Sequence, residues 1–162
     1  MLGSQNKMKK TTLHIALALL FGSLSLYIYF ALIGVVTVWG DEKILYSWIF
    51  ELPKPIQQTA YLLSTDLEGF IIAIPVLGSF GLILGFIVKK YPLLFGFIEY
   101  IGALSFYFMY HVFILDGNFM WIDSVPVWSQ ILPFFLWLFI FLCASLIGNK
   151  KLKPIISVQL KN

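Results

Sequence analysis

The sequence predicts an all-α membrane protein, a bundle of four transmembrane helices with short interfacial helices in its first outer loop. Its composition is 60% hydrophobic and 12% charged, against roughly 25% charged residues in an average soluble domain. Apolar runs of about 20 residues, the length that crosses a hydrocarbon core, recur four times. Nearly all charged residues lie outside these runs, in the loops and at the two ends of the chain. The 162 residues therefore form a single membrane domain, with little chain outside the bilayer for a nucleotide-binding or hydrolytic domain.

The ends of the apolar runs predict where each span begins and ends. Gly40 follows the first run, as glycine often does at a helix C-terminus. Thr65 and Glu68 precede the second run with the spacing of a capping box, which predicts a helix start there. Proline opens the third run, a position that it tolerates well. The predicted spans are about 13–39, 69–88, 92–115 and 127–148, joined by outer loops at about 40–68 and 116–126.

The lysines predict the orientation. Nine lysines and no acidic residue lie before the first span, between the second and third, and after the fourth, whereas the outer loops hold seven acidic residues and two lysines. Lys and Arg concentrate on the cytoplasmic side of membrane proteins. Both termini are therefore expected in the cytoplasm, in a plasma membrane and specifically a bacterial inner membrane. Because these lysines orient the chain and suit anionic head groups, the basic charge does not indicate a nucleic-acid partner.

The first outer loop carries apolar residues at helical spacing. Such residues fall on one side of a helix over 44–49, and the stretch 56–63, after two prolines, again mixes polar and apolar residues. This pattern predicts one or two helices lying in the membrane interface. Tryptophan is common at that depth, so the candidate interfacial surface comprises Trp48, Ile49 and, in the second outer loop, Trp121. The segment is either a connector that covers the bundle or a docking surface or lid.

Small residues in the second span predict close helix packing. Gly81 and Gly85 form a GxxxG pattern, and Gly78 lies about one turn earlier. Such a stripe lets two helix backbones approach closely. In a chain with four spans, contact within the chain is the favoured interpretation, and dimerisation is the alternative.

Glu99, Tyr107 and His111 are the candidate functional polar residues of the third span. An ionisable side chain in a span is costly unless it faces protein, water or a cation. Glu99 is thus either a functional group or a residue that extends toward the lipid boundary. Tyr107 and His111, one turn apart, predict a polar pair facing the interior, in which His111 is either a hydrogen-bonded packing residue, the favoured interpretation, or a functional group. Glu99 and His111 are separated by about 18 Å of helix rise, so they form no acid–base pair.

No catalytic, cofactor or metal site is expected. Cys143 is the one cysteine, which excludes an internal disulfide. His14 and His111 lie at opposite ends of the bundle, and no Cys, His or carboxylate cluster has the spacing of metal ligands. The chain has neither a glycine-rich phosphate loop nor paired aspartates within its spans.

Residues 101–111, with the sequence IGALSFYFMYH, resemble a late helix of the membrane acyltransferases. In that helix a glycine is followed three residues later by serine, then by aromatic residues and a histidine. The resemblance covers about a dozen residues, the histidine comes one position early, and the arginine and histidine pattern of the family's catalytic half has no counterpart. It implies a non-catalytic fragment. In size, span number and cytoplasmic termini the chain is also similar to immunity proteins against pore-forming bacteriocins.

Together these features predict a small interaction or accessory protein that acts through helix contacts in the bilayer. It would be a subunit, a scaffold or an immunity-type protector. The expected partners are the lipid bilayer and another membrane protein or a second copy of the chain. The main alternative is a small transporter or channel component that uses Glu99, and an enzyme ranks third.

Overall fold

The structure, a computed structural model, describes residues 2–39, 51–88, 90–114 and 127–159. In these ranges it is all-helical, with α1 at Leu2–Trp39, α4 at Lys54–Ile87, α5 at Pro92–Ile114 and α6 at Val127–Gln159. Each helix contains a stretch long and apolar enough to cross a membrane, over Lys9–Val35, Gly69–Ile87, Pro92–Phe113 and Gln130–Lys150. The chain is therefore a multi-pass helical membrane protein.

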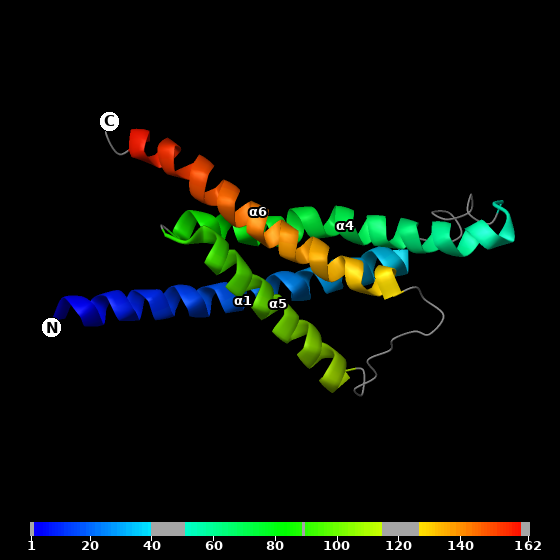
Figure 1. The fold of residues 1–162 in the computed structure, drawn as a ribbon, viewed down its shortest axis with the longest axis horizontal. Coiled ribbons are helices and arrows are strands. Elements are labelled where there is room, and N and C mark those ends of the chain that lie inside the picture. Colours follow the sequence, from blue (N-terminus) through cyan, green and yellow to red (C-terminus); the bar gives the residue numbers. More distant parts are fainter. Residues whose placement is uncertain (1, 40–50, 89, 115–126, 160–162) are drawn as a thin grey trace.

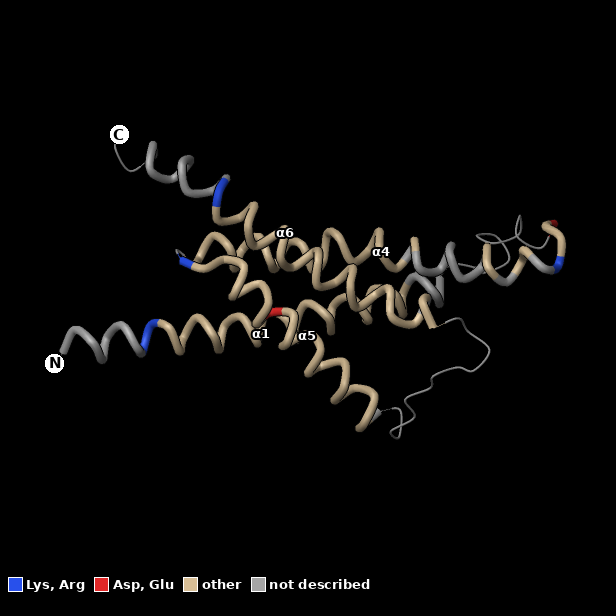
Figure 2. Tube along the Cα trace, viewed as in Figure 1, with Lys and Arg blue, Asp and Glu red and all other residues tan. Residues whose placement is uncertain are grey.

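The four helices run alternately up and down. The start of α1, the turn between α4 and α5 and the end of α6 lie at one end of the molecule (Figure 1). Figure 2 shows lysines at this same end, near the start of α1, beside the turn and late in α6, and further charged residues at the opposite end, where α4 begins. Helix α1 packs mainly on α5, and α4 packs mainly on α6. Toward its C-terminal end α5 diverges from the other helices.

Helix α4 begins well before the span that it contains. Pro53 precedes it, and the Pro53 carbonyl accepts hydrogen bonds from the backbone N–H groups of Ile56 at 2.8 Å and Gln57 at 3.2 Å. The Gln57 side-chain Nε2 donates to the Leu52 carbonyl at 2.7 Å, which ties the first turn to the preceding chain. Proline is well accommodated in a first turn. The helix then continues without interruption to Ile87.

Two expectations for this region differ from the structure. The capping-box sequence around Thr65 and Glu68 does not start a helix, because those residues lie inside α4. The stretch 56–63 is helical, but it is the beginning of α4 and not a separate helix, since no proline or glycine follows Pro55 until the span itself is reached. The other predicted interfacial segment, with Trp48 and Ile49, and the anchor Trp121 lie outside the described residues.

Buried side chains form two clusters along the bundle. The larger joins all four helices and contains Leu26, Tyr29, Ala73, Leu77, Ala103, Trp137, Ile140 and Phe141. The smaller lies nearer the end with the termini and contains Ala18, Leu84, Val88 and Phe95. Many large apolar side chains, such as Phe135 and Phe139, are exposed. This arrangement suits a bilayer, where lipid covers apolar surface and helices associate by close packing.

Candidate functional site

The interior of the bundle is built on a close crossing of α1 over α5. A Cβ atom at Gly22 would overlap the backbone carbonyl oxygen of Glu99. Conversely, a Cβ atom at Gly102 would overlap the carbonyl oxygen of Leu19 and lie 2.8 Å from its Cα. The Ser23 hydroxyl donates a hydrogen bond across the crossing to the Gly102 carbonyl at 3.0 Å. The two backbones are thus in direct contact, and no larger residue fits at either glycine.

The GxxxG stripe forms a second close crossing, between α4 and α6. A Cβ atom at Gly81 would lie 2.8 Å from the Cβ of Ala144, and one at Gly85 would overlap the carbonyl oxygen of Ser145. Gly78 is in looser contact, because its Cβ would lie 3.8 Å from Ile140 Cγ2. In the structure these glycines therefore pack against a helix of their own chain.

Two polar side chains of α6 bind backbone carbonyls near the α4–α5 turn. The Asn149 Nδ2 donates to the carbonyls of Gly85 at 3.2 Å and Val88 at 2.5 Å. The last carbonyls of a helix have no partner within it, so Asn149 satisfies the end of α4. The Ser145 hydroxyl donates to the Pro92 carbonyl at 3.1 Å, at the start of α5. These polar groups bind the end of α4 and the start of α5 to the interior of α6.

Glu99 lies on the face of α5 that is buried in the bundle. Its neighbours on this face, Phe95 and Ala103, are buried as well, and Glu99 itself is 0% exposed. Among the described residues neither carboxyl oxygen has a hydrogen-bond partner. Figure 2 shows red, the colour of Asp and Glu, on α5 in the middle of the bundle, away from the blue lysines at the end of the bundle where the termini lie. The side chain does not reach the lipid boundary, and a negative charge on it would be uncompensated and therefore costly.

Tyr107 and His111 lie together on α5, toward its C-terminal end. Their ring centroids are 4.2 Å apart. Tyr107 also meets Phe134 and Trp137 of α6 edge-on, at 5.2 and 6.1 Å. Such edge-on contacts are favourable for aromatic rings. Tyr107 thus belongs to an aromatic contact between α5 and α6. Because Tyr107 and His111 lie further along α5 than Glu99, the rise of the helix separates both residues from the Glu99 carboxyl group.

Several residues that make close contacts are not singled out by the sequence. Gly22 and Gly102 at the first crossing and Gly148 at the second are in backbone contact with a neighbouring helix. Gly22 follows Ala18, and Gly148 follows Ala144, by four residues. This spacing of small residues is the same signal as in GxxxG. Asn149 is recognisable from sequence as the end of an apolar run, but its hydrogen bonds depend on which helix lies beside it.

Among the described residues, the interior groups that could take part in chemistry are the side chains of Glu99, Tyr107 and His111. Within the described ranges no group of three or more His, Cys, Asp or Glu side chains could hold a metal ion. His14 packs edge-on against Phe95, with ring centroids 5.8 Å apart, in the part of the bundle near the termini. Comparison with known protein families, with curated proteins and with solved structures found no match for this chain.

Proposed function

We propose that the protein is a membrane interaction protein that binds another membrane protein. The observation that carries this proposal is the extension of α4 beyond its span. Residues 54–68, which we call the arm, precede the apolar stretch that begins at Gly69. At 1.5 Å per residue the arm is about 22 Å long. In Figure 1 α4 continues well past the neighbouring ends of α1 and α6.

The arm carries apolar side chains on one side. Ile56 is 52% exposed and Leu67 is 59% exposed. They are eleven residues apart, just over three full turns, so they lie on the same side of the helix, with Ala60 between them. An exposed apolar stripe on a helix that has left the hydrocarbon region is typical of a surface that binds another protein.

The interior supports the same proposal. Ser23 and Ser145 both donate hydrogen bonds to the backbone of a neighbouring helix. At both crossings glycines bring helix backbones into contact. Polar groups and small residues used in this way hold helices in fixed positions. A closely packed bundle with a projecting arm suits a subunit, a scaffold or a protector. We place it in a bacterial inner membrane with both termini in the cytoplasm, because the lysines are distributed as the positive-inside rule requires.

Affinity purification in mild detergent tests this function. We expect one defined membrane protein to co-purify with the chain in a fixed ratio. The double variant Ile56→Asn with Leu67→Asn should lose it, because the apolar stripe would become polar. Lys54→Gln is the matched control, since Lys54 is exposed on the opposite side of the arm. If the variant and the control retain the same proteins, or if no membrane protein co-purifies, the proposal is wrong.

A small transporter is the second candidate, and the burial of Glu99 favours it. A carboxyl group with no hydrogen-bond partner among the described residues could carry a proton or bind a cation. In a transporter, Glu99→Gln should abolish proton or cation flux into proteoliposomes while the protein still folds. In an interaction protein the same change should leave partner binding intact, because it keeps the shape and removes a buried ionisable group. The two readouts together separate the candidates.

A further inference from the structure

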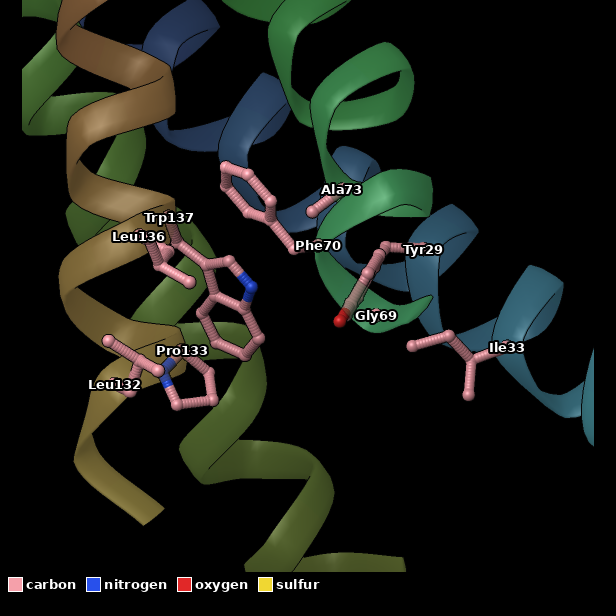
Figure 3. A pocket seen from close by; sticks show the side chains of 9 residues that line it. All are labelled: Tyr29, Ile33, Gly69, Phe70, Ala73, Leu132, Pro133, Leu136 and Trp137. Carbon is pink, nitrogen blue, oxygen red and sulfur yellow. The ribbon is translucent and has the colours of Figure 1, made fainter. Parts of the chain in front are cut away.

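A cavity of about 110 Å³ lies between α1, α4 and α6 (Figure 3). Its walls are mainly apolar and aromatic, with Tyr29 and Ile33 from α1, Gly69 and Phe70 from α4, and Leu136 and Trp137 from α6. Gly69 contributes no side chain, which leaves room in the cavity. A Cβ atom there would lie 3.0 Å from the Tyr29 hydroxyl oxygen.

All three helices line this cavity with residues from the half of their spans that is farther from the termini. Gly69 is the first residue of its apolar span, Ile33 lies two residues before the end of its span, and Leu136 lies six residues after Gln130, where the α6 span begins. At 1.5 Å per residue these positions lie between the span boundary farther from the termini and about 9 Å below it, and the Cα of Trp137 lies one residue deeper. Helical side chains lean toward the N-terminus of their helix, so the indole of Trp137 extends from α6 back toward that boundary. The ester groups and first methylenes of phospholipids lie at the boundary, between the head groups and the hydrocarbon core.

The polar atoms of the cavity suit such a group. In Figure 3 the Trp137 indole Nε1 points into the cavity, while Phe70 and Leu136 contribute apolar walls. An indole N–H is a donor only, and a tryptophan that is largely buried usually finds an acceptor. An ester carbonyl supplies that acceptor, and the methylenes next to it suit the apolar walls.

We propose that this cavity binds the ester and first methylenes of one acyl chain of a diacyl phospholipid. The lipid lies in the leaflet opposite the termini, and Trp137 Nε1 donates a hydrogen bond to its ester carbonyl oxygen. This site is independent of the partner surface on the arm and goes beyond the proposed function.

Two lipids that differ only at the ester test the site. The purified protein is titrated in detergent with dioleoyl phosphatidylglycerol and with its diether analogue, which lacks the ester carbonyls, and bound lipid is counted by native mass spectrometry. The wild type should bind the diester about 3- to 10-fold more tightly, the range of one neutral hydrogen bond. Trp137→Phe keeps an aromatic ring but removes the N–H, so the preference should disappear.

Two leucine variants test the location without removing the indole. Gly69→Leu should weaken binding of both lipids at least about 10-fold, because the new side chain occupies the cavity. Gly34→Leu is the matched control, since Gly34 has nothing within 4 Å of its Cβ position. Equal binding of the two lipids by the wild type would overturn the proposal. So would a preference that survives in Trp137→Phe, or Gly69→Leu binding lipid as well as Gly34→Leu does.

Discussion

Gly22 and Gly34 lie in the same helix, about three turns apart, and differ in what faces them. Gly22 is in contact with the backbone of α5, whereas Gly34 faces open space. In the sequence the only hint of this difference is the small residue Ala18 four positions before Gly22, where Gly34 has Phe30. Which helix backbone faces Gly22 depends on the place where α5 crosses α1.

Alanine substitutions at these two glycines should have opposite effects. Gly22→Ala must push α5 away, because its Cβ would overlap the Glu99 carbonyl oxygen, and we expect a loss of about 1–3 kcal/mol of stability. Gly34→Ala should stabilise by up to about 1 kcal/mol, since alanine is the better helix former. The midpoint of heat-induced aggregation, followed by gel filtration in detergent, measures both. Shifts in the same direction for both variants would contradict the crossing.

Asn149 should matter through its N–H groups. Asn149→Leu has a similar size but leaves the Gly85 and Val88 carbonyls without this donor. The expected loss is about 1–2 kcal/mol, at the lower end for an unsatisfied buried acceptor because the site is near the membrane boundary. Thermal stability in detergent is again the measurement, with Ile147→Ala, an exposed site on the same helix, as the control. Equal stability of the two variants would show that the asparagine has no structural role.

At the scale of elements, α4 combines a membrane span and an arm in one helix of 34 residues. A cysteine on the arm should therefore be accessible from the aqueous side, while one in the span should not. In a Cys143→Ser background, Thr59→Cys should react with a membrane-impermeant maleimide and Ile74→Cys should not. Both sites are exposed in the protein itself, so only the bilayer separates them. Labelling of both cysteines, or of neither, would refute this division of α4.

The sequence predicts α5 well and α4 only in part, for a physical reason. A helix that crosses the membrane needs an apolar run as long as the hydrocarbon core is thick, so the ends of the run mark the ends of the span. The third span is expected at 92–115, and α5 extends over Pro92–Ile114. A helix outside the hydrocarbon needs no apolar run, so the mixed polar and apolar residues 56–63 predict only a short interfacial helix in a loop, whereas 54–68 are the continuous beginning of α4. The glycine stripe predicts a close contact, but its partner α6 depends on the tertiary arrangement. The cavity combines residues from three helices, which no single stretch of sequence encodes.

For the whole molecule, the charge distribution predicts orientation in the membrane. Nine lysines flank one side of the spans and two lie on the other. Reporters fused after Lys90 and at the C-terminus should therefore be cytoplasmic, whereas reporters near Lys54 and Asn118 should be outside. Alkaline phosphatase and green fluorescent protein fusions give opposite signals on the two sides. A single reversed reporter would contradict the arrangement.

The close crossings have a consequence for biosynthesis. Helices enter the membrane in the order in which the ribosome delivers them, yet α1 makes its closest contact with α5, and α4 with α6. Neither crossing joins helices that are consecutive in the chain. During synthesis α1 is therefore in the bilayer before its partner α5, and α4 before its partner α6. A chain that stopped after α5 would leave Gly81 and Gly85 facing lipid, and the newly inserted protein becomes a closed bundle only when its last helix arrives.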